Sequence, residues 1–162
     1  MTNDLHLSGP TVTLFGDRDA LEDALGDELG RRGCSIHSVT IPMGWLSTVT
    51  HAVVRLETPT GEQALTDLTS RDVPAAHVVA VYGTDLDGDT SARLDELCRT
   101  AGEHHAVSVI RHAPLGPPVQ DAPFDLTPAE LAGDIADEIA RGGPSPSFVS
   151  RTVEPRRDGA QD

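Results

Sequence analysis

The chain contains no lysine, and its aromatic residues are few: three Phe, one Tyr and one Trp among 162 residues. The absence of lysine excludes a Schiff base and a catalytic ammonium group. Because aromatics are scarce, the core must consist mainly of aliphatic side chains and alanine. No apolar run approaches the roughly 18 residues of a membrane-spanning helix. The two cysteines, Cys34 and Cys98, lack a C-x-x-C spacing, and no signal peptide is recognisable, so we predict a cytoplasmic protein with reduced thiols.

The 12 arginines are outnumbered by 26 Asp and Glu residues, so the formal net charge is −14. A nucleic-acid backbone or an anionic membrane surface would be repelled by this charge. We therefore expect neither nucleic-acid nor membrane partners.

Short β-rich runs alternate with segments of helical periodicity between residues 11 and 141. This order predicts one three-layer, Rossmann-like α/β domain over residues 11–143, with a mostly parallel sheet of about five strands. Residues 1–10 are expected to form a flexible arm, and residues 144–162 a flexible tail with acidic residues and arginines. The expected strands are 11–15, 35–41, 51–56, 77–82 and 106–110.

Helix ends are marked by local signals. Gly33 stands where a residue with positive φ ends the first expected helix. Thr60 and Gln63 have capping-box spacing for a second helix, and Thr127, Pro128 and Glu130 give the same signal for a helix to about residue 141.

The segments TVTLFG, RRGCSIHSV, HAVVRLE, HVVAVYG, SARLDELCR and AVSVIRHAPLGP follow one another in an order that resembles a known family. It is the NAD(P)-dependent epimerase/dehydratase branch of the short-chain dehydrogenase/reductase superfamily. The most specific stretch is Val107–Pro117, and PFDLTPAELAGDIADEIARGG is similar to the family's later segment. The resemblance covers residues 11–141 and implies a shortened Rossmann fold that has lost one strand–helix unit after the second strand.

The chain departs from this family at the cofactor loop and the catalytic dyad. Only Gly16 remains of the glycine-rich turn, and neighbouring carboxylates occupy the helix N-terminus on which a pyrophosphate would rest. Asp89 and Arg93 stand at the positions of the family's Tyr-x-x-x-Lys dyad. We therefore expect no cofactor, with NAD(P) held at Gly16, Asp17 and Arg18 as the alternative.

Other residue clusters suggest weaker possibilities. His104 and His105 precede a strand, and we interpret them as part of a polar loop rather than as metal ligands. The acidic loop Asp85–Asp89 does not fit a calcium-binding register. Trp45 lies in an apolar connection that we interpret as an interface patch. No metal site is predicted.

We predict first a non-redox pseudoenzyme that acts as an oligomeric or accessory subunit, through self-association or a protein partner. A specialised-metabolite or sugar pathway follows from the resemblance alone. The alternative is a small-molecule enzyme, an isomerase, lyase or cyclase, that uses the cleft at the carboxyl edge of the sheet. Its candidate catalytic residues are Asp89, Arg93, Tyr82, Arg111 and His112. An NAD(P)-dependent reductase or epimerase is the third possibility.

Overall fold

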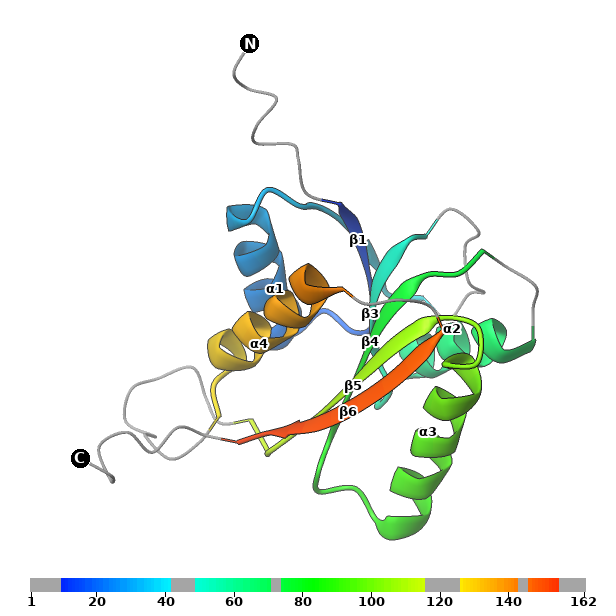
Figure 1. Ribbon diagram of the computed structural model, residues 1–162. Helices are drawn as coiled ribbons and strands as arrows, with labels where there is room; N and C mark the ends of the chain where they lie inside the picture. Colours follow the sequence, from blue (N-terminus) through cyan, green and yellow to red (C-terminus); the bar gives the residue numbers. More distant parts are fainter. Residues whose placement is uncertain (1–9, 42–48, 71–73, 116–125, 143–145, 155–162) are drawn as a thin grey trace.

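The computed structural model describes residues 10–41, 49–70, 74–115, 126–142 and 146–154. Within these residues six parallel strands form one sheet in the order β2-β1-β3-β4-β5-β6 (Figure 1). The predicted α/β fold with a parallel sheet is confirmed. The strands are β1 Thr11–Phe15, β2 Ser35–Val39, β3 His51–Arg55, β4 His77–Gly83, β5 Ala106–His112 and β6 Ser147–Val153.

The sheet has one strand more than the five expected, because β6 lies within the predicted tail. The prediction of a flexible tail is therefore wrong for residues 147–153. The Pro-, Ser- and Arg-rich composition suggested disorder, but the run SFVSRTV supplies β-branched and aromatic residues that favour a strand. Phe148 packs towards one face of the sheet and Val153 is buried on the other.

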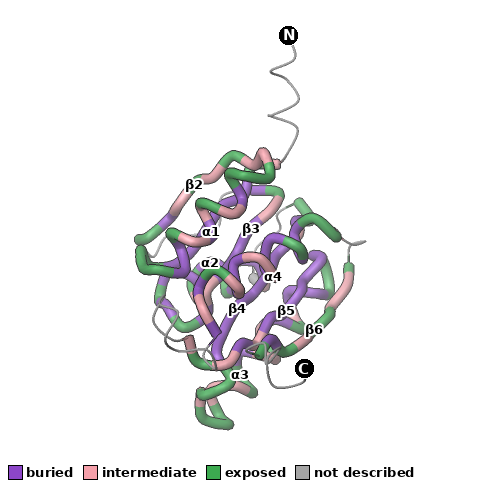
Figure 2. The backbone as a smooth tube through the Cα atoms, turned by 90° about the vertical axis from the view of Figure 1, so that its left-hand side faces the viewer, coloured by how far each residue is buried: buried purple, intermediate pink, exposed green. Residues whose placement is uncertain are grey.

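Helices cover both faces of the sheet (Figure 1). Helices α1 (Ala20–Arg31) and α4 (Pro128–Arg141) pack against each other on one face, and α2 (Pro59–Ser70) and α3 (Gly88–Ala101) pack on the other. Strand β4 is buried on both faces: Val78, Ala80 and Tyr82 contact the α2/α3 layer, whereas Val79 and Val81 contact the α1/α4 layer. Figure 2 shows the buried strands between the two helical layers. The resulting core is largely aliphatic, as the composition predicted.

The helix ends agree with most of the expected signals. Gly33 has φ 86°, and Thr127 and Glu130 form a complete capping box at the start of α4. The predicted cap at Thr60 is wrong: Thr58 caps α2, and its Oγ1 accepts a hydrogen bond from the Gly61 N–H at 3.0 Å. Pro59 occupies the first helical position, which suits a residue without an N–H group, so α2 begins before Thr60.

The strand order contains a topological switch point. After β2 forms on one side of β1, the chain crosses to the other side to form β3. In open parallel sheets, ligands bind at the carboxyl ends of the strands beside such a point. We therefore expect a ligand site at the carboxyl ends of β1, β3, β4 and β5.

Candidate functional site

An ion pair crosses the switch point between β1 and β3. Arg55 is the last residue of β3, and its Nη1 lies 2.7 Å from Asp19 Oδ1 and 3.4 Å from the Asp17 carbonyl oxygen. A Cβ at Gly16 would lie 3.1 Å from the Arg55 Cβ. Glycine at this position therefore lets the arginine side chain pass close to the end of β1.

The same carboxylate caps helix α1. Asp19 accepts a hydrogen bond from the Glu22 N–H at 3.1 Å, and Glu22 and Asp23 add negative charge in the first turn. Burial alone would raise the pKa of Asp19, but hydrogen bonds from Arg55 and from Glu22 N–H outweigh this effect and lower it. Asp19 therefore stays ionised where the family resemblance would place a pyrophosphate. Of the candidate cofactor residues, Asp17 and Arg18 are exposed and Gly16 is buried beside Arg55.

A cavity of about 290 Å³ lies along the same edge, at the ends of β3, β4 and β5. Its walls combine four ionisable side chains with three apolar residues. They are Arg55, Glu57, Val81, Asp85, His112, Pro114 and Leu115.

His112 is held in one orientation within this wall. Its side chain is 8% exposed, and Nδ1 lies 2.8 Å from the Ala113 carbonyl oxygen. Because a carbonyl oxygen can only accept, this hydrogen bond requires a proton on Nδ1, and in the neutral tautomer that has this proton the lone pair lies on Nε2. A backbone-anchored imidazole of this kind can accept a proton from a bound molecule.

Two carboxylates approach each other over Gly83. The Gly83 N–H donates a hydrogen bond of 2.5 Å to Glu57 Oε2. A Cβ at Gly83 would lie 2.6 Å from Asp85 Oδ1 and 3.0 Å from Glu57 Oε2, so both carboxylates occupy the space that a side chain would fill. Among the described residues, neither Glu57 nor Asp85 forms an ion pair with an arginine, because Arg55 is bound to Asp19. The cavity therefore has a surplus of negative charge.

The structure brings only one of the five sequence-predicted catalytic residues to this cavity, namely His112. Arg111 precedes it and points to the opposite face of the sheet. Tyr82 is fully buried in the α2/α3 layer, and burial raises its pKa. Asp89 and Arg93 lie in α3 and are exposed, and Arg93 forms an ion pair with Glu62 of α2.

Sequence reasoning missed Arg55 and Glu57, and it considered Asp85 only as part of an acidic loop that does not fit a calcium-binding register. The signal that singled out Arg111, a charged residue at the end of an apolar strand, also applies to Arg55 in HAVVR. Glu57 and Asp85 follow strands β3 and β4 by two residues each. A search for charged residues just after the parallel strands would have found all three.

Other residues that the sequence singled out contribute to the fold rather than to the cavity. His105 is fully buried, and its Nδ1 accepts the Ala76 N–H at 3.0 Å. In the acidic loop, Asp87 caps α3 by accepting the Thr90 N–H at 2.7 Å. Trp45 lies outside the described residues.

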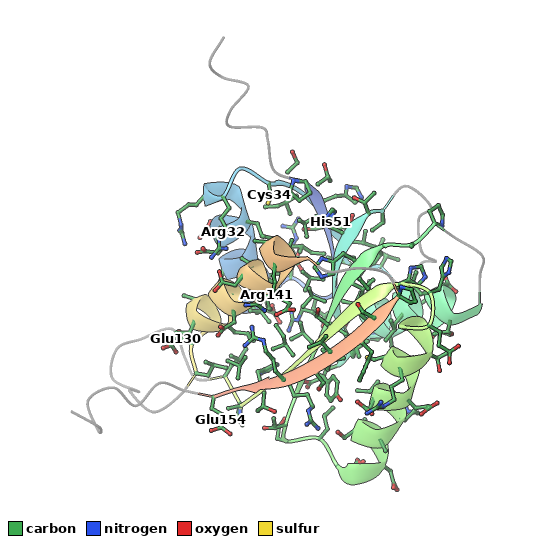
Figure 3. All side chains as sticks on the ribbon, viewed as in Figure 1. Arg32, Cys34, His51, Glu130, Arg141 and Glu154 are labelled. Carbon is green, nitrogen blue, oxygen red and sulfur yellow. The ribbon has the colours of Figure 1, made fainter. Side chains whose placement is uncertain are left out.

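A second cavity, of about 260 Å³, lies at the amino end of the sheet and includes Cys34 and His51 (Figure 3). Burial raises the pKa of the Cys34 thiol and lowers the pKa of His51, so neither group is activated there. Cys98 is buried in the α2/α3 layer, which raises its pKa to about 12.

The described residues contain no group of three or more His, Cys, Asp or Glu that could hold a metal ion. They also include no helix long and apolar enough to cross a membrane.

No family model, curated protein or solved structure matches this chain. The resemblance to the epimerase/dehydratase branch therefore rests on the sequence segments given above. The function of the site therefore has to be inferred from the geometry of its own residues.

Proposed function

We propose that the chain binds a small molecule bearing an amine or several hydroxyl groups in the carboxyl-edge cavity. The observation that carries this proposal is the pairing of two carboxylates, Glu57 and Asp85, beside the oriented ring of His112. Carboxylates accept hydrogen bonds from ammonium and hydroxyl groups and repel phosphate. Since Asp19 also holds Arg55, the described residues of the wall offer no free cation to an anionic ligand.

The chemistry that fits these groups is proton transfer without redox change. His112 would take a proton at Nε2 while its Nδ1–H bond to the Ala113 carbonyl keeps the ring in place. Glu57 and Asp85 would orient hydroxyl or amine groups of the ligand. An isomerase, lyase or cyclase is the reaction class that uses such groups. In this proposal His112, Glu57 and Asp85 take the roles that the enzyme alternative gave to Asp89 and Arg93.

The second candidate is an oligomeric or accessory subunit that has lost the family's redox chemistry. Two observations favour it: Asp19 caps α1 at the expected phosphate position, and the outer edge of β6 pairs with no other described strand. The first five strands have the order 2-1-3-4-5, which is a common doubly wound order in its own right and also fits an origin in the epimerase/dehydratase branch. Removing the third strand from the order 3-2-1-4-5-6 leaves the order found here for the first five strands.

The ligand class can be tested by nuclear magnetic resonance on the full chain. Glucosamine, myo-inositol, inorganic phosphate and NAD+ serve as probes, and the ring signals of His112 report binding. We expect glucosamine or myo-inositol to shift the His112 signals and to leave those of the exposed His37 unchanged. Phosphate and NAD+ should shift neither.

Carboxylate variants sharpen this test. Asp85→Asn and Glu57→Gln should each weaken probe binding by at least about tenfold, the loss expected for a charged hydrogen bond. Glu103→Gln, which changes an exposed acid outside the cavity wall, is the matched control. Binding of NAD+ with unchanged affinity in both carboxylate variants would overturn the proposal.

A further inference from the structure

Strand β6 ends the sheet, and no other described strand pairs with its outer edge. It runs for seven residues, and its one described neighbour in the sheet is β5 (Figure 1). Native proteins usually protect such an edge with proline, lysine, a bulge or a short strand. The segment SFVSRTV has none of these protections. Its single charged residue, Arg151, is neutralised by Glu138 and Asp134 of α4.

The hydrogen-bonding groups of β6 alternate between β5 and the open side. Ser147 N–H donates to the His105 carbonyl at 3.2 Å, and the Val153 carbonyl accepts from Ala113 N–H at 2.9 Å. The odd-numbered residues therefore pair with β5 in the parallel register. The N–H and C=O groups of Phe148, Ser150 and Thr152 point outward.

We propose that β6 pairs antiparallel with β6 of a second copy of this chain, around a two-fold axis at Ser150. In this register Ser150 faces Ser150 of the other copy, and Phe148 faces Thr152. Each of these is a pair of outward-facing residues that can exchange two hydrogen bonds. The two sheets then form one continuous twelve-stranded sheet. A two-fold axis makes the interface self-complementary and closes the assembly at a dimer.

Side chains at the edge favour a second copy as the occupant. Val149 is 52% exposed, and it is one of two large hydrophobic side chains that the described residues expose strongly. In the proposed register it lies opposite Arg151 of the other copy, whose aliphatic stem can cover it. On the other face, Phe148 is already held by Arg99, whose guanidinium carbon lies 4.6 Å from the ring centroid.

Charge permits pairing at both edge strands, because neither β2 nor β6 contains an acidic residue. Each copy carries a net charge of −14, so two copies repel over most of their surfaces. Residues 147–153 contain no acidic residue, which removes local repulsion where the strands meet. The other edge strand, β2, has five residues, and its exposed side chains are Ser35 and His37. β6 is therefore the longer edge, and of the two edge strands it is the one that exposes a large hydrophobic side chain, Val149. This proposal does not depend on the ligand cavity.

Sedimentation velocity on the full chain tests the proposal directly. We expect a species of twice the 17.1 kDa chain mass, with tighter association at high salt because screening reduces the repulsion between copies. Ser150→Pro removes the central outward N–H of both strands and should weaken the dimer by at least about tenfold. Ser150→Ala keeps that N–H and should leave association unchanged.

Cysteine crosslinking tests the register and does not depend on how Ser150→Pro folds. In the proposed dimer the two Ser150 Cα atoms lie about 5.5 Å apart, within disulfide range. Ser150→Cys should therefore form a covalent dimer on mild oxidation. The matched variant Thr152→Cys should not, since its two copies lie roughly 14 Å apart. A monomer at all salt concentrations would overturn the proposal, as would equal crosslinking of the two variants.

Discussion

Replacing Gly61 by alanine tests whether the start of α2 packs directly on the backbone of β3. A Cβ at this position would lie 2.0 Å from the Arg55 carbonyl oxygen and 2.6 Å from the Arg55 carbonyl carbon. These are main-chain atoms at the end of a central strand, so they cannot rotate away as a side chain could. Overpacking of this kind costs about 1–3 kcal/mol. The gain from replacing a helical glycine by alanine is about 1 kcal/mol.

We expect Gly61→Ala to lower the free energy of unfolding by about 2 kcal/mol, because the overlap is with main-chain atoms and lies at the upper end of the overpacking range. The melting temperature should fall by roughly 4–8 °C in a chain of this size. The matched control is Gly133→Ala in α4, where no atom lies within 4 Å of the added Cβ. That variant should gain up to about 1 kcal/mol.

Urea unfolding followed by far-ultraviolet circular dichroism measures both variants, and equal slopes would show that the unfolded states are comparable. The reasoning would be refuted if Gly61→Ala were as stable as the parent chain while Gly133→Ala showed its expected gain. That result would mean that α2 does not pack closely on the Arg55 backbone. Arg55 would then lack the support that fixes its side chain beside the cavity.

Two further stability predictions follow from the helix caps and the buried histidines. Thr127→Ala should lose about 1 kcal/mol of unfolding free energy in the same urea assay. Thr127→Ser keeps the capping hydroxyl and should lose much less. Equal losses in the two variants would contradict the role of this hydroxyl. Burial lowers the pKa of His51, His77 and His105 below the ordinary value of 6.5, so the unfolded chain takes up protons first as the pH falls. Thermal melts should therefore show stability that is steady above pH 7 and declines towards pH 5, and a melting temperature that rises on acidification would contradict this assignment.

Much of the fold could be predicted because local signals agree with the tertiary structure. The uninterrupted apolar run of β4 predicts a strand buried on both faces, and α4 carries both its capping box and a terminal glycine. Strand β6 could not be predicted in the same way. Its alternation is weak, because Ser150 and Thr152 share a face with Phe148, and among the described strands it pairs with β5 alone.

The candidate site was harder to predict, because its residues come from three strand ends that are distant in the sequence. Arg55 and His112 are separated by more than fifty residues and meet because β3, β4 and β5 are neighbours in the sheet. The family resemblance directed attention to Asp89 and Arg93, which follow β4 by several residues and lie on an exposed helix. For the residues of this site, the distance from the end of a strand was a better guide than alignment with the family's catalytic motif.

The residues that cap the helix N-termini also bear on which class of ligand the carboxyl edge of the sheet can bind. Helix N-termini at the carboxyl edge of a parallel sheet commonly bind phosphate, because their N–H groups are unpaired and their dipoles are positive. Here each helix supplies its own acceptor: Asp19, Thr58, Asp87 and Thr127 each take a main-chain N–H of the first turn. Two of these acceptors are carboxylates, which add negative charge at the point where an anion would approach. Together with Glu57 and Asp85, they concentrate negative charge at this edge, and for this reason we expect amines or polyols rather than nucleotides as ligands.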